Sequence, residues 1–578
     1  MLTPASPRIW SIIAASAVAV ALSATFAGAQ PGGDGAVLYN GIRLLEPWPP
    51  QDHQLSLDPV PPPYLSAPPA VIPIDVGRQL FVDDFLVADS TLERVFHLSQ
   101  YYQDNPVVDF DRPWEHQSDG DRRGPLAMAF SDGCWYDPAD GLFKLWYHAD
   151  YGARHLCMAT SRDGVHWDKP EFDVVPGTNI VMERPGAARV VWLDLEATDP
   201  ARRFVLITTL GGEDLIPGGA PWWGSRGSMW LAFSPDGIHW SELQSRRGPT
   251  GDRNSAFHNA LRGVWVMSIR AYEPFDTLTG PQRIRRYWEL TDLADGPDWG
   301  YGNAPLWCAA DRLDLTRADQ NHIQPQLYNL DAVAYESVLL GLFTIWRGGT
   351  GAQEGRPKPN EVCVGFSRDG FHWSRPERRG FMPISETEGD WNWGNVSSVG
   401  GCCLVVGERL HFYCSGRRGK PYFRDAGGAT GLAFLRRDGF ASMRAGDGEG
   451  SLTTHPLSFS GGHLFVNADA AGGEVRVEVL GEGGALIEGL TRDACLPVTA
   501  DSTIAPVRWQ GVEDLARLAG TPVRLRFILR NADLYAFWVS PDAAGASNGY
   551  VAAGGPGFST NRDTVGAAAY EAAGAISD

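Results

Sequence analysis

The sequence predicts an all-β protein, a five-bladed β-propeller followed by a C-terminal β-sandwich. Three observations support this prediction. Short runs rich in Val, Ile, Phe, Tyr and Trp, bounded by Gly, Asp and Pro, fill residues 73–450, and no persuasive amphipathic helix interrupts them. A heptapeptide recurs through the same region. Beyond residue 450 the heptapeptide is absent, and apolar residues alternate with polar ones as in half-buried strands.

The repeat sets the number of blades. It occurs as SRDGVHW at 161–167, SPDGIHW at 234–240 and SRDGFHW at 367–373, with a weaker RRDGFAS at 436–442. The first two copies start 73 residues apart and the last two 69, whereas the middle interval of 133 residues is close to two periods. TDLADGPDW at 291–299 occupies the place of the missing copy. Five units of about 70 residues therefore result.

The residues of the heptapeptide suit a tight turn. Asp accepts hydrogen bonds from nearby backbone N–H groups, Gly adopts positive φ, and Trp fills a gap between neighbouring sheets. An equivalent Asp in every unit argues against a catalytic role for Asp163, Asp236 or Asp369. A hairpin pattern such as CWYDPADGLFKLWYH from residue 134 precedes each turn, so each unit predicts one four-stranded blade.

The N-terminal residues carry the pattern of an export signal. A basic start around Arg8, an apolar run from Ile12 to Phe26 and the small residues Ala27-Gly28-Ala29 predict a signal peptide over residues 1–29, and hence a secreted or periplasmic protein. The alternative is a retained membrane anchor, for which the run is short and Ala-rich.

The remaining chain divides by composition. Residues 30–72 are Pro-rich and predict a linker or surface wrap. Residues 73–450 form the predicted propeller, in which Phe81–Val87 is expected to close the ring as an outer strand. Residues 451–543 predict the sandwich, which packs on the propeller and carries no catalytic group. Residues 544–578 are rich in Gly, Ala, Ser and Asn and predict a flexible tail.

Charge and cysteine content exclude several classes of partner. With 49 basic and 69 acidic residues the net charge is -20, which disfavours nucleic acid or an anionic membrane and suits a neutral ligand better. The eight cysteines are scattered without the spacing of a zinc site, so neither a metal nor another cofactor is expected. A Cys402–Cys414 bridge and buried free thiols both stay open.

Several motifs resemble a known family. The S-x-D-G-x-H-W repeat, WYDPADGLFKLWY and the sandwich together resemble the five-bladed glycoside hydrolases of families 32, 43, 68 and 130. FVDDFLV (81–87), NPVVDFDRPWE (105–115), YNLDAVAYES (328–337), GDWNWGN (389–395) and LFVNADAAGGEVRVEVL (464–480) look like a group of bacterial secreted hydrolases related to family 32. The W-M-N-D-P-N-G, R-D-P and E-C motifs of true family 32 enzymes are absent. Neither fructan specificity nor those catalytic positions transfer.

The resemblance implies where catalytic groups lie. In such propellers the starts of the innermost strands face a central funnel, which selects Asp132, Asp252, Asp331 and Asp390. Glycosidic hydrolysis needs two carboxyl groups, one as proton donor and one as base or nucleophile. Asp331 is favoured most, with Asp252 expected nearby, while turn capping is the alternative for Asp132 and Asp390. Glu115, in a polar and aromatic loop, is a further candidate acid or sugar-binding group.

Substrate binding is assigned to a second set of residues. Trp391 and Trp393 are candidate stacking platforms for a sugar ring, with Asn395 beside them, although any one of 21 tryptophans is more often a core residue. Arg270 and the pair Arg283 and Arg285 suit an acidic or hydroxyl-rich substrate, with surface ion pairs as the alternative.

The sequence therefore predicts a secreted glycoside hydrolase that cleaves O-glycosidic bonds of an oligo- or polysaccharide. The alternative is a non-catalytic, lectin-like carbohydrate-binding propeller, because propellers serve both roles. A sialidase is disfavoured, since the x-D-x-G spacing of its turn motif is not matched. The sugar, the linkage and the oligomeric state stay open.

Overall fold

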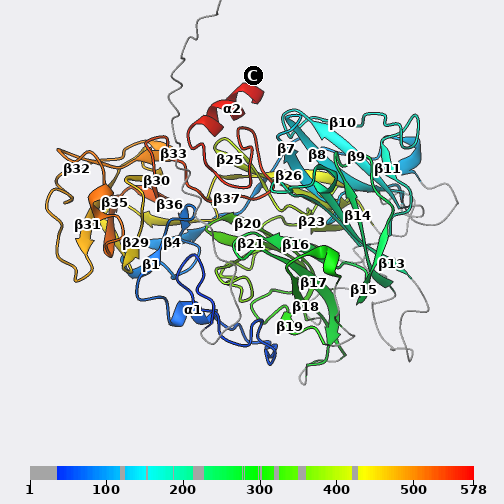
Figure 1. Cartoon of the computed structure of the whole chain (residues 1–578), viewed down its shortest axis with the longest axis horizontal. Helices are drawn as coiled ribbons and strands as arrows, with labels where there is room; N and C mark the ends of the chain where they lie inside the picture. Colours follow the sequence, from blue (N-terminus) through cyan, green and yellow to red (C-terminus); the bar gives the residue numbers. More distant parts are fainter. Residues whose placement is uncertain are drawn as a thin grey trace, which may run out of the picture.

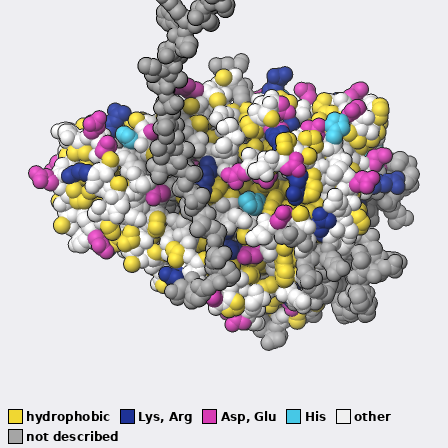
Figure 2. Space-filling view, in the orientation of Figure 1, with side chains coloured by type: hydrophobic (Ala, Val, Ile, Leu, Met, Phe, Trp, Pro, Cys, Tyr) yellow, Lys and Arg dark blue, Asp and Glu magenta, His cyan; other side chains and the backbone are white. Residues whose placement is uncertain are grey.

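The computed structural model describes residues 35–577 except 117–123, 151–153, 187, 212–226, 276–277, 279, 297–298, 300–302, 318–323, 349–358 and 420–426. The predicted signal peptide lies outside the described residues. Strands account for 44% of the chain and helices for 5%, which confirms the all-β class. Within the described residues no helix has the length and apolar character needed to cross a bilayer. Acidic and basic side chains are interspersed over the face shown in Figure 2.

Five antiparallel sheets follow one another along the chain (Figure 1). The first contains β6 (Ala127–Met128), β7 (Cys134–Asp137), β8 (Leu142–Ala149), β9 (His155–Ser161), β10 (Trp167–Asp168) and β11 (Ile180–Met182). The second contains β12 (Arg189–Leu193), β13 (Phe204–Gly211), β14 (Gly227–Ser234) and β15 (Gln244–Thr250). The third contains β16 (Ser255–Asn259), β17 (Val264–Glu273), β18 (Gln282–Leu290) and β19 (Leu306–Cys308).

The fourth and fifth sheets recruit strands from distant parts of the chain. The fourth combines β20 (Gln326–Glu336), β21 (Val338–Trp346) and β22 (Asn360–Ser367) with β37 (Tyr550–Val551). The fifth combines β23 (Asn395–Ser398), β24 (Leu404–Val406), β25 (Arg409–Arg417) and β26 (Gly428–Arg436) with β5 (Gln100–Tyr101).

The five sheets close into a ring through their first strands. β12 contacts β7 and β16, β16 contacts β20, and β20 contacts β23. The fifth sheet then meets the first, because β26 contacts β6 and the backbone N–H of Cys134 donates to the carbonyl oxygen of Gly400 at 3.2 Å. This is the radial arrangement of a β-propeller.

The segment that closes the ring differs from the prediction. β5 pairs with β26, Tyr101 opposite Ala433, and thereby supplies the outer strand of the fifth sheet. Phe81–Val87 instead belongs to the second domain, where Phe81 packs 5.6 Å from the ring of Phe537. The prediction for this segment was wrong because its apolar residues fill the core of the sandwich and not the rim of the ring.

The repeated heptapeptides form the turns after the third strands. The Oδ1 atom of Asp163 accepts hydrogen bonds from the backbone N–H groups of Val165 and His166, both at 2.8 Å, and Gly164 has φ +74°. Asp236 and Asp369 make the same contacts in the second and fourth sheets. The structural role predicted for these aspartates is confirmed.

The second domain is a sandwich of two six-stranded sheets around a separate hydrophobic core (Figure 1, left). One sheet contains β1 (Ile72–Pro73), β3 (Val87–Ser90), β28 (Gly450–Thr454), β29 (Leu457–Ser458), β31 (Glu474–Gly481) and β35 (Val523–Arg530). The other contains β2 (Gln79–Leu80), β4 (Glu93–Phe96), β27 (Ala441–Ala445), β30 (His463–Asp469), β33 (Asp501–Pro506) and β36 (Ala532–Ser540). β32 (Cys495–Leu496) and β34 (Arg508–Trp509) form a small separate pair.

The C-terminal residues are ordered, so the prediction of a flexible tail over 544–578 was wrong. β37 pairs with β20, Val551 is fully buried, and α2 (Ala568–Ser577) follows. The small residues are needed for packing: a Cβ atom on Gly555 would lie 1.8 Å from the carbonyl oxygen of Val405. The Gly- and Ala-rich composition thus reflects close backbone approach.

The Pro-rich N-terminal residues lie against the fourth sheet. The hydroxyl of Tyr39 donates to the carbonyl oxygen of Ser337 at 2.6 Å, and the ring of Trp48 lies 5.8 Å from that of Phe371. Tyr64, in the short helix α1 (Pro63–Ser66), is buried.

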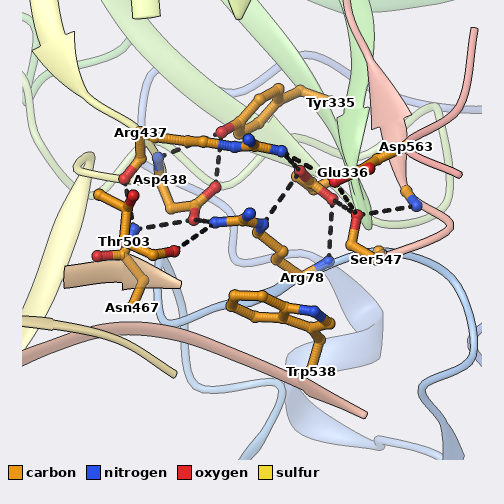
Figure 3. A network of polar contacts seen from close by, with 12 residues as sticks. Arg78, Tyr335, Glu336, Arg437, Asp438, Asn467, Thr503, Trp538, Ser547 and Asp563 are labelled. Carbon is orange, nitrogen blue, oxygen red and sulfur yellow. Dashed lines mark hydrogen bonds and ion pairs between the residues drawn. The ribbon is translucent and has the colours of Figure 1, made fainter. Parts of the chain in front are cut away.

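A fully buried ionic network joins the sandwich to the propeller (Figure 3). Arg78 forms ion pairs with Asp438 at 2.9 Å and with Glu336 at 3.5 Å. Arg437 forms ion pairs with Glu336 at 3.3 Å and with Asp563 of the C-terminal segment at 3.1 Å. Since these five side chains come from both domains and from the C-terminal segment, the network fixes all three together.

Candidate functional site

Polar side chains of three sheets meet at the centre of the ring. Asn329 of β20 donates through Nδ2 to the Oγ of Ser131 at 2.9 Å and to Asp331 at 2.8 Å. The hydroxyl of Ser398, in β23, donates to the same carboxylate. Ser131 belongs to the first sheet and Asn329 to the fourth, which are not neighbours in the ring, so these contacts cross its axis. We call Ser131, Asn329, Asp331 and Ser398 the axial cluster; Asp132 directly follows Ser131 in the chain.

Asp331, the residue favoured by sequence, lies in the axial cluster. It is 3% exposed, and burial raises the pKa of its carboxyl group, while the hydrogen bond from Ser398 and the positive charges of Arg285 and Arg253 act in the opposite direction. Asp252 was expected beside it. Its side chain is 59% exposed and pairs with Arg270 at 3.2 Å, and it is the next residue, Arg253, whose charge acts on Asp331.

Asp132 is held by a different set of partners. Its carboxylate is fully buried and contacts Arg189 twice, Oδ2 to Nη2 at 2.7 Å and Oδ1 to Nε at 3.3 Å. The Nε2 atom of His148 lies 3.3 Å from Oδ1. Burial and the adjacent Arg189 lower the pKa of His148 to about 3, so this imidazole is neutral near pH 7.

The first residues of the GDWNWGN segment lie in a turn and against the fifth sheet. Asp390 is exposed in a turn and accepts a hydrogen bond from the hydroxyl of Ser385. Trp391 packs over the fifth sheet, since a Cβ atom on Gly431 would lie 2.2 Å from its ring, and it meets Tyr101 edge to face. Its position is that of a packing residue.

The two other residues predicted from this segment are nearly buried. Trp393 is 9% exposed. Asn395 is 6% exposed and begins β23, where it pairs with Arg417.

Glu115 has a structural environment. Its buried carboxylate accepts hydrogen bonds from the backbone N–H groups of Asp111 and Arg112 at 2.7 and 2.8 Å, from the Tyr147 hydroxyl at 2.7 Å and from the Lys169 ammonium at 2.6 Å. These four donors occupy the acceptor positions of the carboxylate. Most of the loop that follows it, residues 117–123, lies outside the described residues.

Sequence reasoning missed the residues that surround Asp331 and Asp132. Arg189, His148, Asn329 and Ser398 were not singled out, although Asn329 lies two residues before Asp331 and therefore on the same face of its strand. Arg253 was missed as well; its guanidinium lies 3.7 Å above the centre of the Phe130 ring.

Arg270, Arg283 and Arg285 do come together, on the third sheet. Arg270 of β17 is paired with Arg285 of β18, and Tyr272 is paired with Arg283 two residues further along. Because directly opposite residues point to the same side of an antiparallel pair, these four side chains share one face.

No protein-family model and no curated protein matches the sequence. Among solved structures, the chain is similar to an N-acetylgalactosamine deacetylase from F. plautii in complex with blood group B trisaccharide, with 13% identity over 60% of this chain and 96% of that chain and a TM-score of 0.37. A putative glycoside hydrolase from Parabacteroides distasonis is 15% identical over 58% of this chain and 96% of its own, with a TM-score of 0.35. A family 43 arabinoxylan arabinofuranohydrolase from Bacillus subtilis is 11% identical over 72% and 79%, with a TM-score of 0.30. Similarities this weak do not assign an activity, and the fold rests on the strand pairing described above.

Proposed function

We propose that this protein is a secreted glycoside hydrolase that cleaves O-glycosidic bonds at the centre of the propeller. One observation carries the proposal: Asp331 lies in the axial cluster, Asp132 directly follows the cluster residue Ser131 in the chain, and the two carboxyl groups are held by different partners. Burial raises the pKa of Asp331, which favours its protonated form, whereas Asp132 forms a buried ion pair with Arg189. Two carboxyl groups whose environments differ in this way suit the two roles of glycosidic hydrolysis.

In this mechanism Asp331 donates its proton to the leaving glycosidic oxygen. Asp132 either attacks the anomeric carbon or removes a proton from the attacking water. Asn329 and Ser398 orient the acid through hydrogen bonds to its carboxyl group, and Arg189 holds the second carboxylate in place. The mechanism requires that the substrate reaches this level of the axis, where both carboxyl groups are buried.

That burial favours a second candidate, a carbohydrate-binding propeller without catalytic activity. Asp132 is fully buried and Asp331 nearly so, whereas half-buried arginine and aromatic side chains lie beside the cluster. A binding protein would contact the carbohydrate through these arginine and aromatic side chains, and the two carboxylates would only stabilise the fold.

A panel of plant, algal and bacterial polysaccharides, followed by chromatography of released sugars, tests the proposal. The hydrolase releases products from at least one glycan, and Asp331→Asn abolishes the release while folding is retained, as measured by circular dichroism. Binding to a glycan that the wild-type protein does not cleave would support the second candidate and contradict the first.

A further inference from the structure

The third sheet carries four arginines next to the axial cluster, at the junction with the fourth sheet. Arg270 and Arg285 lie opposite each other on β17 and β18, Arg283 lies opposite Tyr272, and Arg253 lies two residues before the start of β16. Arg283 lies 4.9 Å from the centre of the Trp346 ring in the fourth sheet. We call Arg253, Arg270, Arg283 and Arg285 the arginine wall.

The arginine wall has more positive charge than its neighbours neutralise. Arg270 and Arg253 both pair with Asp252, at 3.2 and 3.7 Å, but Arg283 donates to the neutral Oε1 of Gln326 at 2.6 Å. Arg285 is fully buried and donates to the backbone carbonyl oxygens of Arg253, at 2.5 Å, and of Tyr328. Among the residues that the structure describes, neither Arg283 nor Arg285 forms an ion pair with a carboxylate.

This arrangement is costly for the folded protein alone. Like charges directly opposite each other on neighbouring strands repel, and a buried guanidinium that forms no ion pair loses hydration, which the charge of Asp331 offsets only in part for Arg285. Burial and the adjacent Arg270 lower the pKa of Arg285 to about 9. The buried Nε atoms of Arg270, Arg283 and Arg285 also lack hydrogen-bond partners within the described part of the chain. An anionic ligand bound to the partly exposed Arg270 and Arg283 would supply the missing charge.

We infer that the arginine wall binds an acidic saccharide, one that carries carboxylate or sulfate groups. Planar guanidinium groups match the paired oxygens of such anions, and the half-buried rings of Tyr272 and Trp346 offer faces for the apolar side of a sugar ring. The inference names the substrate class of the proposed function and rests on it.

The overall charge of the protein does not oppose this inference. A net charge of -20 led us to expect a neutral ligand. Surface charges further than a Debye length of about 8 Å are largely screened at physiological salt, so the local excess of guanidinium groups decides the affinity at this site. The expectation of a neutral ligand is replaced by that of an acidic one.

Two pairs of polymers that differ only in charge test the inference. The full-length mature protein is titrated with polygalacturonate and with its methyl ester, and with dextran sulfate and unmodified dextran, by isothermal calorimetry. We expect the charged member of at least one pair to bind about tenfold or more tightly, with affinity that falls as salt is added. The pair that responds identifies carboxylate or sulfate as the recognised group.

Variants assign the binding to the wall. Arg283→Gln should weaken binding of the charged polymer about tenfold. Arg517→Gln, at an exposed arginine in the sandwich, should leave it unchanged. Arg253→Gln is the second variant if Arg283→Gln does not fold, as judged by circular dichroism, and it should weaken binding in the same direction.

Equal affinity for the charged and neutral members of both pairs would overturn the inference, as would unchanged binding by folded Arg283→Gln. Measuring both binding and cleavage shows whether this inference or the proposed function fails. Binding of an acidic polymer through Arg283 without any cleavage would contradict the hydrolase and support the site. Cleavage of a neutral glycan by Arg283→Gln at the wild-type rate would contradict the site and support the hydrolase.

Discussion

The buried network between the two domains gives a sharp prediction for stability. Replacing Arg78 with Met keeps an extended apolar side chain but removes the charge that pairs with Asp438 at 2.9 Å and Glu336 at 3.5 Å. It also removes a 2.8 Å hydrogen bond to the carbonyl oxygen of Thr503. Breaking a fully buried pair leaves an uncompensated charge, so we expect Arg78→Met to lower the free energy of unfolding by about 3–5 kcal/mol.

Urea unfolding followed by tryptophan fluorescence measures this cost, since Arg78 lies 4.1 Å from the centre of the Trp538 ring. Arg492→Met is the matched control. Its ion pair with Glu449 is 42% and 47% exposed, and its loss should cost about 1 kcal/mol or less.

The origin of the cost is tested by a second change. Against the effect of burial, the charges of Arg78 and Arg437 hold the pKa of Asp438 below its ordinary value. Without Arg78 this carboxylate is partly uncompensated, so adding Asp438→Asn to Arg78→Met should recover part of the lost stability. A cost for Arg78→Met no larger than that of the control, or a double variant whose costs simply add, would refute the reasoning.

Three further predictions concern single groups and the C-terminal segment. Burial raises the pKa of Asp331, so its carboxyl group contributes fully to the free energy of unfolding below the ordinary pKa, and this contribution falls as pH rises through the raised value. Near pH 7, Asp331→Asn should therefore melt no lower than the wild-type protein. A thermal midpoint several degrees lower would contradict this prediction. Burial is outweighed by hydrogen bonds from the His166 ring and backbone, which lower the pKa of Asp163 to about 2, so the stability that its carboxylate contributes is present above pH 3.8 and is lost as pH falls towards 2. In thermal melts, Asp163→Asn should be less stable than the wild-type protein at pH 6 but equal to it near pH 2. A difference that does not depend on pH would contradict the lowered pKa. A chain that ends at Ala543 lacks β37 and Asp563 and should give little soluble protein, and a wild-type thermal midpoint for this truncation would show that the segment is dispensable.

The order of the sheets could be predicted from sequence because each unit carries its own turn. The Asp and Gly of each heptapeptide act within a few residues of one another, as at Asp163 and Gly164, so local sequence fixes them. Ring closure by Tyr101 depends on pairing with Ala433, 332 residues away, and no local pattern specifies it. The ordered C-terminus was missed for a related reason, since its glycines are required by backbones far away in the chain.

The candidate site was predictable to a similar extent. Asp132 and Asp331 were selected because they were expected near strand starts; Asp132 lies just before β7, whereas Asp331 lies in the middle of β20. Such a position does not determine which partner a side chain meets. The contact of Asp132 with Arg189 depends on the irregular stretch between β6 and β7, where Gly133 has φ +125°. Trp391 could not be placed from sequence, because an aromatic residue between glycines serves packing and sugar stacking equally well.

The most direct test of the central claim is the turnover of Asp331→Asn on a glycan that the wild-type protein cleaves. The substitution keeps the shape of the side chain and removes the ionisable group, so we predict a loss of turnover of about 10²-fold or more, with glycan binding and thermal midpoint retained. Near wild-type turnover in the folded variant would contradict the assignment of Asp331 as the catalytic acid at the axis of the propeller.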